Sequence, residues 1–125
     1  MHEGDRLRLV VADNDPDALD LVVTDLTLEG HHVVAACLRG AEALERCLVE
    51  RPDVAVLDHR MAPGPHGLEV AQRLAVEAPS VGVVLYTNYE DAELVRGARA
   101  CGAVYLQKGD LRRLRRAVRD LGGRD

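Results

Sequence analysis

The 125-residue chain contains no tryptophan, no phenylalanine and only three tyrosines. Apolar residues nevertheless make up 47% of it, so a core large enough for one domain must be built from valine, leucine and alanine. No apolar run approaches the roughly 20 residues of a membrane-spanning helix. The first residues, with Glu3 and Asp5, lack the basic and apolar regions of a signal peptide. We therefore expect a cytoplasmic protein without membrane contacts.

Cysteine is scarce as well, and the three cysteines are isolated in apolar surroundings at Cys37, Cys47 and Cys101. An odd number of separated cysteines is typical of small buried side chains in a reducing compartment. The net charge is −5 and both signs are spread along the chain, so we do not expect direct nucleic-acid binding. Lysine occurs once, as Lys108, beside fifteen arginines. A compact ammonium that follows a short apolar run is a candidate for holding an anion.

Short apolar segments alternate with amphipathic helical patterns five times along the chain. The apolar segments are nearly continuous, as expected for parallel strands that are covered on both faces. Aspartate, proline and glycine mark the ends of the helical segments, and Asp15 before Pro16 is a plausible N-cap. We predict strands at 7–12, 33–36, 53–57, 81–86 and 104–106, and helices at 15–29, 40–50, 68–76, 91–100 and 111–121.

This alternation, with its short connections, predicts a single α/β domain over residues 1–121, followed by a short C-terminal tail at 122–125. The expected fold is a doubly wound, five-stranded parallel sheet in the order 2-1-3-4-5, a flavodoxin-like (βα)5 arrangement. Ligands of such open sheets bind beyond the carboxyl ends of the strands, where the strand order reverses. The polar residues just past each strand are therefore the candidates for a site.

Four such residues are Asp13 after the first strand, Asp58 after the third, Thr87 after the fourth and Lys108 after the fifth. Two carboxylates in one crevice repel, so one pKa should rise unless a cation is near. Carboxylate oxygens completed by water suit Mg²⁺. A metal, a hydroxyl and an ammonium around one carboxylate suit phosphoryl transfer, with Asp58 as the nucleophile that forms an acyl phosphate.

With these residues the chain resembles, over its whole length, the receiver domain of bacterial response regulators, as in chemotaxis receivers. The resemblance implies a phospho-acceptor rather than an enzyme, in which Asp58 takes a phosphoryl group from a sensor histidine kinase or a phosphotransfer protein with Mg²⁺ bound. It also implies that Thr87 turns towards the phosphoryl group, that Lys108 pairs with it, and that Tyr105 swings inward. The stretches that carry the resemblance are Val10–Pro16, Val56–Asp58, Val84–Thr87 and Gly102–Lys108.

The resemblance further implies that the fourth helix, fifth strand and fifth helix form the surface that changes on phosphorylation. A downstream protein, whose identity the sequence does not give, would read that surface. A homodimer formed through the same surface is a second possibility. The last helix carries arginines that form either a solvated face or such a docking face, namely Arg112, Arg113, Arg115, Arg116 and Arg119.

Asn14 departs from the family's pattern, because a second acidic residue that contacts the metal usually stands there. The implied metal ligands are therefore Asp13, Asp58, the backbone carbonyl of Arg60 and, weakly, Asn14, and we expect reduced Mg²⁺ affinity. Asp15 lies close by, but its capping position makes a structural role the better interpretation.

The loops around the site depart as well. One residue has been added between Asp58 and Gly67, and Gly109 replaces the proline that often follows the lysine. We expect the side chains of Arg60 and Tyr89 to crowd the path of an attacking water and to lengthen the phosphorylated state.

Several histidines and one glycine have more than one interpretation. His59 and His66 flank the loop after Asp58, where a metal site is conceivable but solvated side chains fit better. His31 and His32 are expected on the surface. Gly97, inside the fourth helix, indicates either local mobility or a close packing contact.

Two other functions remain open at the level of sequence. The first is a receiver-like interaction module that works without phosphorylation, which Asn14 and the altered loop favour. The second is a small hydrolase with an aspartate nucleophile, for which the chain offers no additional segment to build a substrate pocket.

Overall fold

The structure is a computed structural model that describes residues 6–123. The predictions made on Glu3 and Asp5, and on residues 124–125 of the tail, lie outside the described residues. The last helix includes Gly122, one residue beyond the predicted end of the domain at position 121.

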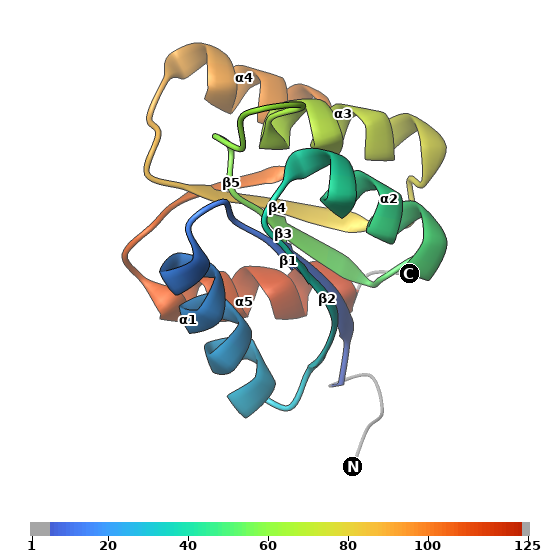
Figure 1. The fold of residues 1–125 in the computed structure, drawn as a ribbon, viewed down its shortest axis with the longest axis vertical. Coiled ribbons are helices and arrows are strands. Elements are labelled where there is room, and N and C mark those ends of the chain that lie inside the picture. The colour runs from blue at the N-terminus through green and yellow to red at the C-terminus, as the bar shows by residue number, and fades with distance from the viewer. Residues whose placement is uncertain (1–5, 124–125) are drawn as a thin grey trace.

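Strands and helices alternate strictly along the chain. The five strands form one parallel sheet in the order β2-β1-β3-β4-β5. Helices α1 and α5 cover one face of the sheet, and α2, α3 and α4 cover the other (Figure 1). The predicted fold class and strand order are confirmed. The elements are β1 (Arg8–Ala12), α1 (Pro16–Leu28), β2 (His32–Cys37), α2 (Gly40–Glu50), β3 (Val54–Leu57), α3 (Gly67–Glu77), β4 (Gly82–Thr87), α4 (Ala92–Ala100), β5 (Val104–Gln107) and α5 (Leu111–Gly122).

The central strand β3 shows why the strands are continuously apolar. All four of its residues are buried. Val54 and Val56 pack in the cluster formed with α1 and α5. Ala55 and Leu57 pack in the cluster formed with α2, α3 and α4. Because successive side chains of a strand point to opposite faces, a strand between two helical layers needs apolar residues at every position.

Aspartate caps begin three of the helices. The side chain of Asp15 accepts a hydrogen bond from the N–H of Asp17 at 3.0 Å, and Pro16 takes the first helical position. Asp91 caps α4, and Asp110 caps α5. Each such cap stabilises its helix by about 1 kcal/mol. Within residues 6–123, no helix combines the length and the apolar character needed to cross a membrane.

Cysteine burial agrees in part with the prediction. Cys37 and Cys47 are fully buried, and burial raises their thiol pKa to about 11 and about 12. Cys101 is half-buried, and its thiol donates to the carbonyl of Ala98. Gly97 has a packing explanation, because a Cβ there would lie 2.8 Å from Cδ2 of Leu68 in α3.

The surface prediction for His31 is wrong. The residue is 5% exposed, and its Nδ1 accepts a hydrogen bond from the N–H of Leu7 at 3.2 Å. His32, the first residue of β2, is exposed as expected. Neighbouring residues at the start of a strand point to opposite sides, so only one of the two could face water.

Candidate functional site

Parallel strands bring four distant side chains to one edge of the sheet. Backbone hydrogen bonds from Asp58 to Ala12 at 2.9 Å and from Lys108 to Thr87 at 3.0 Å continue the sheet pattern one residue past β3 and β5. Asp13, directly after β1, lies at the same edge. The edge therefore gathers the residues that sequence placed at strand ends.

Lys108 lies between the two aspartates. Its Nζ is 2.6 Å from Oδ2 of Asp13 and 3.7 Å from Oδ1 of Asp58. The lone lysine of the chain is thus a counter-ion that two acids share. Arginine could not be exchanged for it freely, because a planar fork fills more space than a point-like ammonium.

Burial makes this cluster sensitive to charge. Asp13 is 3% exposed, Asp58 8% and Thr87 1%. Burial, followed by repulsion from Asp13, raises the pKa of Asp58, while Lys108 and hydrogen bonds from Thr87 and the His59 backbone oppose the rise. Burial alone would lower the pKa of Lys108, but its hydrogen bond to Asp13 and the two carboxylate charges raise it overall. The ammonium of Lys108 therefore offsets part of the negative charge of the two carboxylates.

Thr87 and Tyr105 are linked through the loop between β4 and α4. The N–H of Tyr89 donates to Oγ1 of Thr87 at 3.1 Å, and the hydroxyl of Tyr105 donates to the carbonyl of Tyr89 at 3.0 Å. Oγ1 of Thr87 thus accepts from the backbone of Tyr89, while its hydroxyl donates to the carboxylate of Asp58. Tyr105 is half-buried and packs against the core cluster beneath α4, so its hydroxyl is held by the loop rather than by water alone.

Arg60 and Tyr89, from the loops that follow Asp58 and Thr87, are in contact. The guanidinium carbon of Arg60 lies 4.0 Å from the centre of the Tyr89 ring, a cation–π arrangement. The ring of His59 also stacks on the ring of Tyr89, with 5.6 Å between the two ring centres. Arg60 is two residues after Asp58 and Tyr89 is two residues after Thr87. Their side chains therefore link the two loops that follow these site residues.

The loop from β3 to α3 is organised by its histidines. The backbone N–H of Met61 donates to Nδ1 of His66 at 3.1 Å, and that of Leu68 donates to Nδ1 of His59 at 3.4 Å. His66 also forms a capping box with Glu69 at the start of α3. Both histidines are partly buried and bonded, so the prediction that they are solvated is wrong.

Gly67 ends the same loop in a place where only glycine fits. A Cβ there would lie 2.1 Å from the carbonyl oxygen of Asp58, and the N–H of Gly67 donates to the carbonyl of His59 at 2.7 Å. Within the loop, the Ala62–Pro63 peptide is cis and Met61 is fully buried. The lengthened loop therefore places the first residue of α3 in close contact with the backbone carbonyl of Asp58.

The donor set available to a metal is small. Asp13 and Asp58 supply carboxylates, but Oδ1 of Asp13 accepts from the N–H of Asp15 at 2.9 Å and Oδ2 is bonded to Lys108. Asn14 is exposed beside them. Across residues 6–123 there is no group of three or more His, Cys, Asp or Glu side chains that could hold a metal ion. A cation here would need carbonyl and water oxygens to complete its shell.

Sequence reasoning missed one contact and one backbone conformation in the loop after β5. The hydroxyl of buried Tyr86 accepts from the N–H of Gly109 at 3.4 Å. Gly109 itself has a φ of 127°, which side chains other than glycine rarely adopt. A glycine directly after Lys108 was the available signal for this turn.

One arginine of α5 departs from the solvated face that is expected by default. Arg115 binds Asp25 of α1 with both Nε and Nη2, at 3.0 Å and 2.7 Å. Arg119 lies 3.4 Å from Glu29. Four arginines of the helix are exposed as expected, namely Arg112, Arg113, Arg116 and Arg119.

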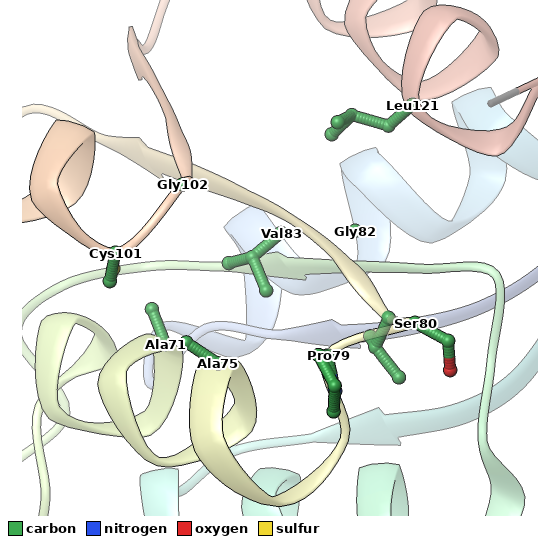
Figure 2. A pocket seen from close by; sticks show the side chains of 10 residues that line it. Ala71, Ala75, Pro79, Ser80, Gly82, Val83, Cys101, Gly102 and Leu121 are labelled. Atoms are coloured by element: carbon green, nitrogen blue, oxygen red, sulfur yellow. The ribbon is translucent and has the colours of Figure 1, made fainter. Parts of the chain in front are cut away.

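A hollow lies elsewhere, at the amino end of β4. It has a volume of about 470 Å³ and is lined mainly by small side chains of α3, β4 and the turn before β5, including Ala71, Ala75, Val83 and Cys101 (Figure 2). No lining residue there is charged. The chemistry of the chain is therefore concentrated at the opposite, carboxyl edge of the sheet.

Comparisons with known proteins show the family of the chain. The family model of the response regulator receiver domain matches residues 9–119. The chain is 36% identical over 127 residues to the probable transcriptional regulatory protein NarL of Mycobacterium tuberculosis, covering 98% of this chain and 58% of that protein. It therefore spans less than two thirds of that relative's length.

Solved structures give the same result. The receiver domain of the response regulator NarL from Mycobacterium tuberculosis is 33% identical with a TM-score of 0.87, over 96% of this chain and 99% of that one. The CheY of the CheX–CheY–BeF3–Mg²⁺ complex from Borrelia burgdorferi is similar in fold alone, at 18% identity and a TM-score of 0.82, over 91% of this chain and 87% of that one. The chain belongs to the response regulator receiver domain family, the phospho-acceptor domains of two-component signalling.

Proposed function

We propose that Asp58 accepts a phosphoryl group from a phosphohistidine of a sensor histidine kinase or phosphotransfer protein in the cytoplasm. One carboxylate oxygen attacks phosphorus, the bond from phosphorus to the histidine nitrogen breaks, and the imidazole leaves with the electron pair. The product is an acyl phosphate on Asp58. The observation that carries the proposal is the shared ammonium of Lys108, 3.7 Å from Asp58 and available to pair with the transferred group.

Mg²⁺ fits the donor set as a weakly held ion. Burial and the charge of Asp13 raise the pKa of Asp58. The two carboxylates therefore have less positive charge near them than they need to stay ionised, and a bound cation would supply it. Asp13, Asp58, the carbonyl of Arg60 and, weakly, Asn14 would hold the ion. When bound, Mg²⁺ would neutralise charge on the phosphoryl oxygens. With a neutral amide at Asn14 and with Lys108 already on Asp13, we expect an affinity below that of a site with three carboxylates.

The signal would leave the site through Thr87 and Tyr105. A phosphoryl oxygen on Asp58 would take over the hydrogen bond that the Thr87 hydroxyl donates to the carboxylate, and would draw that hydroxyl towards it. This movement would break the bond from Tyr89 to Thr87 and release the carbonyl that now holds the Tyr105 hydroxyl. Tyr105 would then turn inward and alter the surface of α4, β5 and α5.

A downstream protein would read that altered surface. A homodimer through the same elements is the alternative from sequence. However, α4 and α5 together carry seven arginines and only two acidic residues. Two copies of such a surface repel, so we favour a different, acidic protein as the partner there.

Phosphodonor treatment tests the proposal directly. The chain incubated with acetyl phosphate and Mg²⁺ should gain the mass of one phosphoryl group, and Asp58→Asn should gain none. Asp53→Asn is a matched control, because Asp53 is an exposed aspartate at the other end of β3. An unchanged mass in the native chain, with a phosphohistidine protein as donor as well, would contradict the proposal.

A phosphorylation-independent interaction module is the second candidate. The 2.6 Å pairing of Lys108 with Asp13 favours it, because this bond must loosen before a metal can use Asp13 fully. The same experiment separates the two functions. Partner binding that persists unchanged in Asp58→Asn, together with the absence of a mass shift, would identify the module.

A further inference from the structure

The turn between β5 and α5 carries the only lysine of the chain. It consists of Lys108, Gly109 and Asp110, and Asp110 caps α5. Gly109 has a φ of 127°, and a Cβ added to it would meet no atom within 4 Å. Glycine is therefore needed there for its backbone conformation and not for space. Because glycine is also the most flexible residue, the turn that presents Lys108 is not stiff by itself.

Two consecutive N–H groups anchor this turn to β4. The N–H of Lys108 donates to the carbonyl of Thr87 at 3.0 Å, and the N–H of Gly109 donates to the hydroxyl of Tyr86 at 3.4 Å. The first bond orients the peptide group before the Cα of Lys108, and the second orients the peptide group after it. The direction in which the Lys108 side chain leaves the backbone is therefore set by these two bonds.

Tyr86 is held firmly enough to restrain the turn. Its side chain is 5% exposed and packs in the buried cluster that includes Val22 and Leu114. With Lys108 and Gly109 it also lines a hollow of about 190 Å³ between α1 and the turn. Only two side-chain torsions place a tyrosine hydroxyl, so a packed ring keeps that oxygen at a fixed point. The distance of 3.4 Å is long for a hydrogen bond, and we therefore expect a modest effect.

The partner of the Tyr86 hydroxyl connects it to the site. A buried tyrosine hydroxyl needs a hydrogen-bond partner in any case. Here the partner is the N–H directly after Lys108, a group that a proline at position 109 would lack. The ammonium of Lys108 is 2.6 Å from Asp13 and 3.7 Å from Asp58, and a displacement of about 1 Å in a reacting group can cost about 100-fold in rate. A restraint on this peptide therefore reaches the chemistry at Asp58.

We propose that Tyr86 is a positioning residue for phosphoryl transfer to Asp58. Its hydroxyl fixes the peptide after Lys108, and this peptide holds the ammonium of Lys108 between Asp13 and Asp58. With the ammonium in place before the donor arrives, less reorganisation is needed as charge develops on the transferred group. The role rests on the proposed function, since it matters only if Asp58 accepts a phosphoryl group.

Tyr86→Phe tests the role, because it removes the hydroxyl and keeps the packed ring. The initial rate of mass gain with acetyl phosphate and Mg²⁺ should fall about three- to fivefold, in the lower half of the range for a neutral hydrogen bond because this bond is long. Val118→Ala is the control for a loss of packing, since Val118 is fully buried in the same cluster but lies within α5, away from the turn. It should leave the rate unchanged.

A double-mutant cycle separates a positioning role from a structural one. In the Lys108→Met background, Tyr86→Phe should slow the residual phosphorylation no further, because the group that the hydroxyl positions is gone. A general loss of structure would instead slow both backgrounds by the same factor.

The position of Lys108 can also be observed without any phosphoryl group. Because Lys108 is the only lysine, labelling with ¹³C-lysine gives a side-chain NMR spectrum of that residue alone. Without phosphodonor or Mg²⁺, the two protons on its ε-carbon should have different chemical shifts in the native chain and in Val118→Ala, since a fixed side chain places them in different surroundings. In Tyr86→Phe this difference should shrink, because a mobile side chain averages the two environments.

Three results would overturn the positioning role alone. They are a phosphorylation rate in Tyr86→Phe equal to that of the native chain, equal slowing by Tyr86→Phe in the native and Lys108→Met backgrounds, and an unchanged ε-proton spectrum of Lys108 in Tyr86→Phe. Each leaves the proposed function intact, because the native chain still gains a phosphoryl group. A native chain that gains none overturns the proposed function, and the positioning role with it.

Discussion

Replacement of Lys108 by methionine should destabilise the protein and make its stability strongly dependent on pH. Methionine keeps most of the side-chain volume, and Arg, the usual conservative choice, would retain the charge. The change leaves Asp13 and Asp58, with side chains 5% and 10% exposed, without their shared cation. Their mutual repulsion is then no longer offset.

The distances give the magnitude. With an effective dielectric constant of about 20, an ammonium attracts a carboxylate by about 6 kcal/mol at 2.6 Å and about 4 kcal/mol at 3.7 Å. Desolvation of the three groups cancels much of this sum, and breaking a buried pair by removal of one partner costs about 3–5 kcal/mol. Domains of this size have about 5–15 kcal/mol of stability, so Lys108→Met should fold but unfold at a clearly lower urea concentration.

The pH dependence follows from the raised pKa of Asp58. Its folded-state pKa lies above the unfolded value of about 3.9, so the folded state takes up a proton first as the pH falls. Protonation removes one of the two repelling charges. The deficit of Lys108→Met relative to the native chain should therefore be largest at pH 7 and shrink as the pH falls through the folded pKa of Asp58.

Urea unfolding followed by far-UV circular dichroism is the suitable assay, because the chain has no tryptophan. Adding Asp58→Asn to Lys108→Met should recover much of the loss, and Mg²⁺ should stabilise the variant more than the native chain. Arg112→Met, at a side chain 86% exposed, should change stability by less than about 0.5 kcal/mol. A loss below about 1 kcal/mol, or one equal at pH 7 and at pH 4.5, would refute the electrostatic reasoning.

Three other predictions concern the loops and the far end of β1. Tyr89→Ala or Arg60→Ala should shorten the lifetime of phosphorylated Asp58 about two- to fivefold. This factor is equivalent to the 0.5–1 kcal/mol of an exposed cation–π contact. Equal rates of phosphate release in the native chain and both variants would disprove the hypothesis that these side chains crowd the attacking water. Gly67→Ala should destabilise by about 1–3 kcal/mol through overlap with the carbonyl of Asp58; an unchanged urea midpoint would count against that contact. Burial lowers the pKa of His31, so the unfolded chain takes up the proton first and stability should fall as the pH drops below about 6.5; His31→Leu should flatten this slope, and a parallel slope would exclude His31 as its source.

The histidines show where sequence reasoning stopped. His31 and His32 are adjacent and identical, and only their position relative to β1 decides that one lies against the backbone of Leu7 while the other faces water. His59 and His66 are seven residues apart in a loop without regular structure. Their hydrogen bonds depend on how that loop folds back on α3, which no periodic pattern in the sequence encodes.

The arginines of α5 illustrate the same limit. Their spacing showed an amphipathic helix but not which helix lies beside it. The winding of the sheet places α1 there, and Arg115 then meets Asp25 across 90 residues of sequence. The opposite charges of the two helices become a single surface only through this placement.

The sequence by itself determined the strand and helix pattern and the four polar residues at the carboxyl ends of the strands. These follow from local periodicity and from the rule that parallel strands end at a common edge. Only the tertiary structure decided that Lys108 bridges Asp13 and Asp58, that Arg60 packs on Tyr89, and that Gly67 lies against the Asp58 carbonyl. Contacts of this kind depend on distances between segments far apart in the chain, and those distances are fixed only when the two faces of the sheet have been packed.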